Sequence, residues 1–240
     1  MKLEKTSGKG PTESLWKTLT REEIVKADDA RVAHMSDEIR QGFRTVEKYP
    51  KSVTFFGSAR FREGDKAYEV ARSIGFKLAK EGYAIITGGG PGIMEAGNRG
   101  AKEAGGNSVG LNIKLPSEQK INPYTTDSTE FSYFFARRIA LAFAAEAYVF
   151  FPGGYGTLDE FYEIITMVQT RRVEPVPIIC VGSEFWNSID GIHRSILKDK
   201  LVTISEGDEK LYKITDDEDE VVRIVKAEPI RNGIEYPHSN

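Results

Sequence analysis

Residues 147–160 read AYVFFPGGYGTLDE, and this stretch decides the fold class. Its first five residues are apolar and predict a buried strand. Three glycines follow within four positions, and Thr157 then opens a helical pattern. A strand that leads through a glycine-rich turn into a helix N-terminus is suited to hold phosphate, because backbone N–H groups and the helix dipole both favour an anion there. The acids at the end of the stretch need a separate explanation.

The same alternation of apolar run and helical pattern extends on both sides of this stretch. It predicts strands at 53–56, 83–87, 108–113, 147–151 and 176–181. Helical patterns are found at 65–80, 91–104, 132–146, 157–170 and 184–200. Near-continuous apolar strands that alternate with helices are typical of a parallel sheet covered on both faces. We therefore expect an α/β protein with a doubly wound parallel sheet and an N-terminal helical extension.

The first fifty residues differ in pattern from the rest of the chain. Residues 1–12 are polar and predict a disordered start. A capping box at Thr20 and Glu23 then predicts a helix, which Pro50 ends. We expect this arm to pack on the domain or on a second subunit. The expected arm, α/β domain and C-terminal tail span residues 1–50, 51–228 and 229–240.

Composition limits the classes of function. The 240 residues carry a formal net charge of −3, which indicates no general affinity for nucleic acid. No apolar run approaches the ~20 residues that cross a bilayer, and the polar N-terminus does not resemble a signal peptide. Cys180 is the single cysteine, and the three histidines lack the spacing of a metal site. We expect a cytoplasmic protein with no metal and no membrane partner.

Two further strand ends carry small polar loops. Residues 57–60 read GSAR and residues 88–92 read GGGPG. The loop at 88–92 has neither the following lysine of a P-loop nor the spacing of a dinucleotide fingerprint, so a tight strand-to-helix turn explains it equally well on its own. Because strand ends of a parallel sheet share an edge, the three loops together favour one pocket lined with backbone amides. The candidate phosphate or substrate contacts in these loops are Gly57, Ser58, Gly88, Gly89, Gly90, Gly153, Gly154, Tyr155, Gly156 and Thr157.

Glu160 is the acid that suggests chemistry at this pocket. Helical spacing places Thr157 and Glu160 on one flank near the helix start, toward the glycine loop. The simpler interpretation is an acid that complements the helix dipole, and the dipole predicts that Glu160 is ionised at neutral pH. A carboxylate that faces a sugar instead of the phosphate can activate water or stabilise a cationic sugar transition state.

Arg137 and Arg138 form a charged pair inside an otherwise apolar helical pattern. One interpretation is a surface pair whose aliphatic stems lead the charges to water. The other is a clamp for an anion or a substrate, which the planar guanidinium suits. The sequence alone leaves both open.

These residues resemble the LOG family, the cytokinin-activating phosphoribohydrolases that are also labelled possible lysine decarboxylases. Residues 152–160 fit the family signature P-G-G-x-G-T-x-x-E. Residues 134–138 occupy the place of the Met-His-x-Arg-Lys element, and residues 88–94 and 56–58 resemble the first glycine loop and the first strand end. The resemblance covers about residues 50–200.

The resemblance implies a Rossmann-like fold and hydrolysis of the N-glycosidic bond of a nucleoside 5′-monophosphate, such as AMP or a cytokinin riboside monophosphate. The products are the free base and ribose 5-phosphate, and no cofactor is implied. Arg137 and Glu160 match the family's catalytic pair, and Glu118 lies near its base-contacting acid. Family members assemble as dimers or larger sets, so we expect a homo-oligomer. Further expected substrate contacts are Arg138, Asp159 and Thr166.

The chain also departs from the family pattern. The Met-His pair before the arginine is absent from this sequence, and Arg138 replaces the lysine, which leaves the preferred base open. An alternative function is a nucleotide carrier, similar to molybdenum-cofactor carriers, that binds without hydrolysis. Lysine decarboxylation with pyridoxal phosphate is disfavoured, because it needs a Schiff-base lysine and neither glycine loop contains one.

Overall fold

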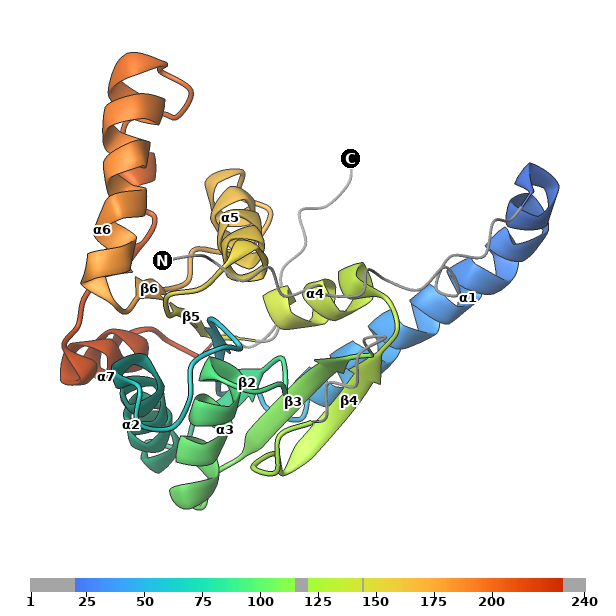
Figure 1. Cartoon of the computed structure of the whole chain (residues 1–240), viewed down its shortest axis with the longest axis horizontal. Coiled ribbons are helices and arrows are strands. Elements are labelled where there is room, and N and C mark those ends of the chain that lie inside the picture. Colours follow the sequence, from blue (N-terminus) through green and yellow to red (C-terminus); the bar gives the residue numbers. More distant parts are fainter. Residues whose placement is uncertain (1–19, 115–120, 144, 231–240) are drawn as a thin grey trace, which may run out of the picture.

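A seven-stranded, all-parallel sheet forms the centre of the computed structural model, which describes residues 20–114, 121–143 and 145–230 (Figure 1). The strand order is β4-β3-β2-β1-β5-β6-β7. The order reverses between β1 and β5, so the loops that follow these two strands flank the topological switch point. The strands are β1 (Ser52–Phe56), β2 (Ala84–Thr87), β3 (Ser108–Ile113), β4 (Asp127–Phe131), β5 (Ala147–Phe150), β6 (Ile178–Cys180) and β7 (Lys213–Ile214).

Helices cover both faces of the sheet, as the apolar strands predict. One core cluster joins the sheet to α1, α4, α5 and α6, and the other joins it to α2, α3 and α7. Neighbouring residues of β1 serve both, since Phe55 belongs to the second cluster and Phe56 to the first. The helices are α1 (Arg21–Val46), α2 (Lys66–Lys80), α3 (Ile93–Glu103), α4 (Phe134–Phe143), α5 (Tyr155–Gln169), α6 (Ser183–Ile192) and α7 (Glu218–Ala227).

The predicted fold class is confirmed, and so are the five predicted strands within a few residues of their ends. Two strands were not predicted. β4 alternates between exposed and half-buried polar residues because it is an edge strand, and β7 contains two residues. The helix predicted at 184–200 divides into α6 and a π-helix, η2 (His193–Lys200).

The N-terminal helix α1 begins at the predicted capping box, where Thr20 and Glu23 exchange hydrogen bonds. It packs on α4 and β4 of its own chain. Glu38 of α1 is buried and accepts hydrogen bonds from the backbone N–H groups of Ser132 and Tyr133 (2.8 and 3.1 Å), just before α4. The arm therefore helps to fix the start of the helix that carries Arg137.

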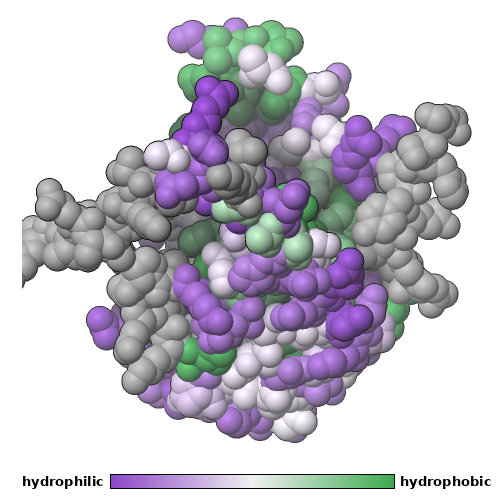
Figure 2. Space-filling view, turned by 90° about the vertical axis from the view of Figure 1, so that its right-hand side faces the viewer, coloured by the Kyte–Doolittle hydropathy of each residue, from purple (hydrophilic) through white to green (hydrophobic). Residues whose placement is uncertain are grey.

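A projection formed by α6 and η2 extends from the body of the molecule (Figure 1). Apolar side chains gather at its tip, whereas the facing surface below it is largely hydrophilic (Figure 2). Leu201 and Val202 are 55% and 76% exposed there. Within the described residues, no helix combines the length and apolar character needed to cross a bilayer.

Candidate active site

Three loops meet at the carboxyl edge of the sheet, as the sequence predicts. The backbone N–H of Ser58, after β1, donates to the Pro152 carbonyl after β5 (3.1 Å). The Ser58 carbonyl accepts a hydrogen bond from the N–H of Ile93 at the start of α3 (3.1 Å). Gly92 has a φ of 70°, and a Cβ there would lie 2.3 Å from the Ser58 oxygen. Glycine is therefore required for this close approach of the loops.

A buried amide network holds the second loop, residues 88–90. Thr87 Oγ1 accepts from the Gly89 N–H (2.9 Å) and donates to Asn98 Oδ1 (2.6 Å). Asn122 Nδ2 donates to the same Asn98 oxygen (2.9 Å) and to the Gly90 carbonyl (3.1 Å). We did not predict this role for Asn98 or Asn122. The available signal was a single polar residue, Asn98, within the buried face of a helical pattern.

Arg137 is buried, with 8% of its surface exposed, so the surface-pair interpretation is wrong for this residue. Its Nε donates to the Leu111 carbonyl in the second half of β3 (2.7 Å). Its Nη2 occupies the space beside Gly88, where a Cβ would lie 2.0 Å from that nitrogen. Burial lowers the pKa of Arg137, and the negative charge of Glu160 acts in the opposite direction. Arg137 is therefore held between two strand ends with its charge directed at the site.

Arg138, the next residue, points elsewhere. Its Nη1 lies 2.8 Å from an Asp159 oxygen, and its Nε lies 2.9 Å from a Glu163 oxygen. Both acids belong to α5, so Arg138 ties α4 to the helix that follows the glycine loop. These pairs also raise the pKa of Arg138. Asp159 is thus neutralised by a partner in the chain instead of facing a phosphate alone.

Glu160 lies in the second turn of α5. Burial raises its pKa from 4.5 to about 7, although the charge of Arg137 acts to lower it. This differs from the expectation that Glu160 is ionised at neutral pH, because desolvation is the largest effect on its carboxyl group. A carboxyl group with this pKa can both accept and release a proton near neutral pH.

The N-terminus of α5 is open to a ligand. Gly154 precedes the helix and offers no side chain to cap its first N–H groups. Tyr155 is 94% exposed, whereas Thr157 is buried. Free N–H groups at a helix start, with the helix dipole behind them, form an anion site. The predicted phosphate loop and the Arg137–Glu160 pair therefore occupy one edge of the sheet.

The sequence of this chain is similar to the sequences of known proteins. Residues 94–225, more than half of the chain, match a family model described as "Possible lysine decarboxylase". The chain belongs to this family, the LOG family. Two rice relatives are a probable cytokinin riboside 5′-monophosphate phosphoribohydrolase, LOGL5, at 31% identity over 159 residues, and the phosphoribohydrolase LOG, at 27% over 164 residues. The matches cover 64% and 67% of this chain but 60% and 64% of those proteins.

A solved structure shares the fold of this LOG-family chain. It is the molybdenum cofactor binding protein of Rippkaea orientalis, with a TM-score of 0.53 and 19% identity. The alignment covers 73% of this chain and 94% of that protein. At this identity the likeness concerns the fold alone.

Two residues that the LOG-family resemblance assigned stay untested by the geometry of the site. Glu118 lies outside the described residues. Thr166 is exposed on α5, and its carbonyl accepts hydrogen bonds from Thr170. At 3.6 residues per turn, six positions place Thr166 about 120° around the helix from Glu160. Its contact with substrate stays a prediction.

Proposed function

We propose that this LOG-family chain hydrolyses the N-glycosidic bond of a nucleoside 5′-monophosphate to the free base and ribose 5-phosphate. The observation that carries the proposal is Glu160, a carboxyl group with a pKa of about 7 beside a buried arginine and behind an uncapped helix N-terminus. The names of the rice relatives support the same reaction class. We also propose a cytoplasmic location, where the lone buried thiol of Cys180 stays reduced.

In this proposal the 5′-phosphate binds at the start of α5. The N–H groups of the 153–157 loop and the helix dipole meet its charge. Arg138 supports the binding indirectly, because it already neutralises Asp159 and Glu163 on the same helix. With those acids paired, less negative charge from α5 acts against a phosphate at the start of the helix.

Glu160 and Arg137 then act on the sugar. As the bond between C1′ and the base nitrogen breaks, its electrons leave with the base and positive charge develops on the ribose, which the ionised Glu160 stabilises. A water molecule adds to C1′ and gives its proton to Glu160. The same proton is then available for the leaving base, so that water is consumed and the carboxylate returns to its starting state. The positive charge of Arg137 favours the ionised form of Glu160, which the reaction needs at its start.

A panel of monophosphates tests this function and the choice of base. We propose AMP and cytokinin riboside monophosphates as the first substrates, because the relatives carry the latter in their names. The purified chain is incubated with AMP, IMP, CMP and an isopentenyladenosine monophosphate, and free base is measured by chromatography. Release of base from at least one compound supports the proposal. Binding without any release across the panel would favour the carrier function instead.

A further inference from the structure

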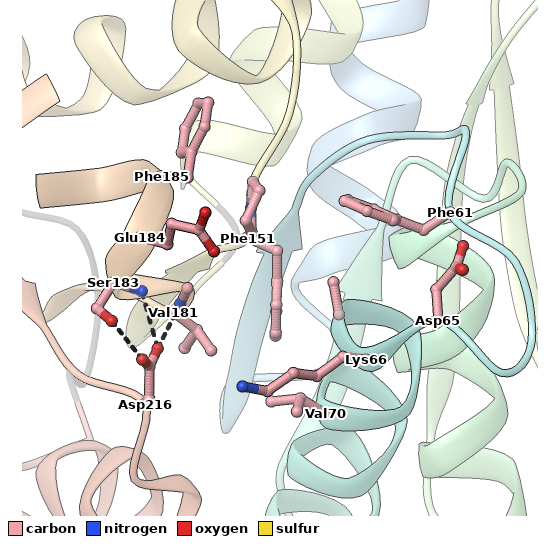
Figure 3. A pocket seen from close by; sticks show the side chains of 13 residues that line it. Phe61, Asp65, Lys66, Val70, Phe151, Val181, Ser183, Glu184, Phe185 and Asp216 are labelled. Carbon is pink, nitrogen blue, oxygen red and sulfur yellow. Dashed lines mark hydrogen bonds between the residues drawn. The ribbon is translucent and has the colours of Figure 1, made fainter. Parts of the chain in front are cut away.

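A cavity of about 820 Å³, whose lining is drawn in Figure 3, lies at the carboxyl edge of the sheet. It opens between the first turns of α2 and α6, over the carboxyl ends of β5 and β6. None of the glycines of the three loops lines it, although Phe61, Phe151 and Pro152 flank two of those loops. The volume is in the range of small-molecule sites, and the sheet edge is the usual place for one.

The cavity has an apolar floor and apolar walls. Phe151 and Val181 form the floor, and both are buried. Phe61 and Phe185 belong to the lining on opposite sides of the cavity (Figure 3). A ligand that buries an aromatic or branched aliphatic body here gains hydrophobic contact on several sides.

Two of the three acids in the lining already have partners. Asp216 accepts hydrogen bonds from the N–H groups of Gly182 and Ser183 (2.8 and 2.9 Å), and from the Ser183 hydroxyl. The charge of Lys66 also acts on Asp216 and lowers its pKa. Asp216 therefore occupies the anion site at the start of α6, which leaves no place there for a ligand phosphate. Asp65 accepts from the Arg62 N–H (2.7 Å).

Glu184 is the acid that remains. Its carboxylate points over the cavity in Figure 3, and among the described residues no hydrogen bond or ion pair reaches its side chain. The lining carries three acids against one base, Lys66, so the cavity is negatively charged on balance above an apolar floor. A positively charged group on an apolar body complements both features.

We propose that this cavity is a binding site for a small organic cation, an amine that carries an aromatic or branched aliphatic body. The ammonium group pairs with Glu184, and the body lies between Phe61 and Phe185 over Phe151. The site is separate from the nucleotide site and does not depend on the proposed hydrolysis.

Calorimetry with three matched probes tests the site on the whole chain. Tryptamine, its neutral analogue tryptophol and its anionic analogue indole-3-propionate share one apolar body. We expect saturable binding of tryptamine, weaker binding of tryptophol and none of the anion. Glu184→Gln weakens tryptamine about tenfold, the effect of one charge-assisted contact.

Two control variants make the result specific. Glu174→Gln removes another exposed glutamate, at the opposite edge of the sheet, and leaves the tryptamine affinity unchanged. Glu160→Gln also leaves it unchanged, because the nucleotide site is separate. Equal affinity for the cation and the anion, or no loss of affinity in Glu184→Gln, would overturn the proposal, as would the absence of any saturable binding.

Discussion

At Glu160, burial and a helix N-terminus act on one carboxyl group in opposite directions. Sequence reasoning includes the dipole, because it depends only on position in the helix. It cannot include burial, which depends on how α4, α5 and the strand ends meet. The same limit applies to Arg137, whose enclosure beside Gly88 is a property of the assembled site. The sequence therefore yields candidate residues for the site, but not their protonation states.

The first prediction concerns the pH dependence of turnover. Because the ionised carboxylate stabilises the cationic sugar, kcat/KM falls as pH decreases through the Glu160 pKa of about 7. The expected slope below that pKa is about tenfold per pH unit. Initial rates with AMP between about pH 5 and pH 9 measure it. A profile that stays flat down to about pH 5 would show that a carboxyl group with an ordinary pKa, or none, limits the reaction.

A second prediction at this scale tests the position of Arg137. In Gly88→Ala the new methyl group takes the place of Nη2, and Met94 Sδ would also be 2.7 Å away. Displacement of the guanidinium should lower kcat/KM by at least about tenfold, or 1.4 kcal/mol. The matched control is Gly191→Ala, since a Cβ at Gly191 meets nothing within 4 Å. Equal activity of both variants would show that the position of Arg137 does not affect the reaction.

Among the helices and strands, the hydrophobic pattern predicted the strands that are buried on both faces of the sheet. It missed the strands that are partly exposed. β1, β2, β3 and β5 are fully buried and were found from apolar runs. β4 is an edge strand of polar residues, and its pairing with β3 is a tertiary contact that local pattern does not contain. The change from α6 to the π-helix η2 was missed for the same reason.

A hydrogen-bonded chain of side chains joins α5 to η2. Tyr212 donates to Asp190 (2.7 Å), so its oxygen accepts from His193 Nδ1–H, and His193 Nε2 accepts from the Tyr162 hydroxyl (both 2.8 Å). Burial lowers the pKa of His193, which keeps the ring neutral. Since the unfolded chain then binds the proton more readily, this contribution to stability is present at high pH and is lost as pH falls below about 6.5.

The third prediction concerns the hydrogen bonds of His193. His193→Phe leaves the Tyr212 hydroxyl without its donor and should destabilise the fold by about 1–3 kcal/mol. Tyr162→Phe removes one partly exposed hydrogen bond and should cost about 0.5–1.5 kcal/mol. Urea denaturation at pH 8 measures both. If His193→Phe were as stable as the wild type, the hydrogen bonds of His193 would not contribute to holding η2 on α5.

At the scale of the whole molecule, the fold and the convergence of three loops were predictable, because both follow from the alternation of strands and helices. Assembly was expected only from the family resemblance. Phe134 and Phe135, on the helix that carries Arg137, are 55% and 44% exposed. Large apolar side chains at the start of α4 are suited to contact a second copy.

The fourth prediction is therefore a homodimer or larger homo-oligomer that uses this surface. Light scattering should give at least twice the 26.8 kDa of one chain, and Phe134→Glu should shift the population toward monomer. A wild-type monomer at micromolar concentration would contradict it. So would a Phe134→Glu variant that keeps the full assembly.

The proposed hydrolysis is tested by the phosphorus balance of AMP that is incubated with the wild-type chain and with Glu160→Gln. Phosphorus NMR distinguishes AMP, ribose 5-phosphate and inorganic phosphate in one sample. We expect the wild type to convert AMP to ribose 5-phosphate with an equal amount of adenine. We expect Glu160→Gln to bind AMP but to leave it intact. Bound and unchanged AMP with the wild type, inorganic phosphate as the product, or full activity of Glu160→Gln would contradict it.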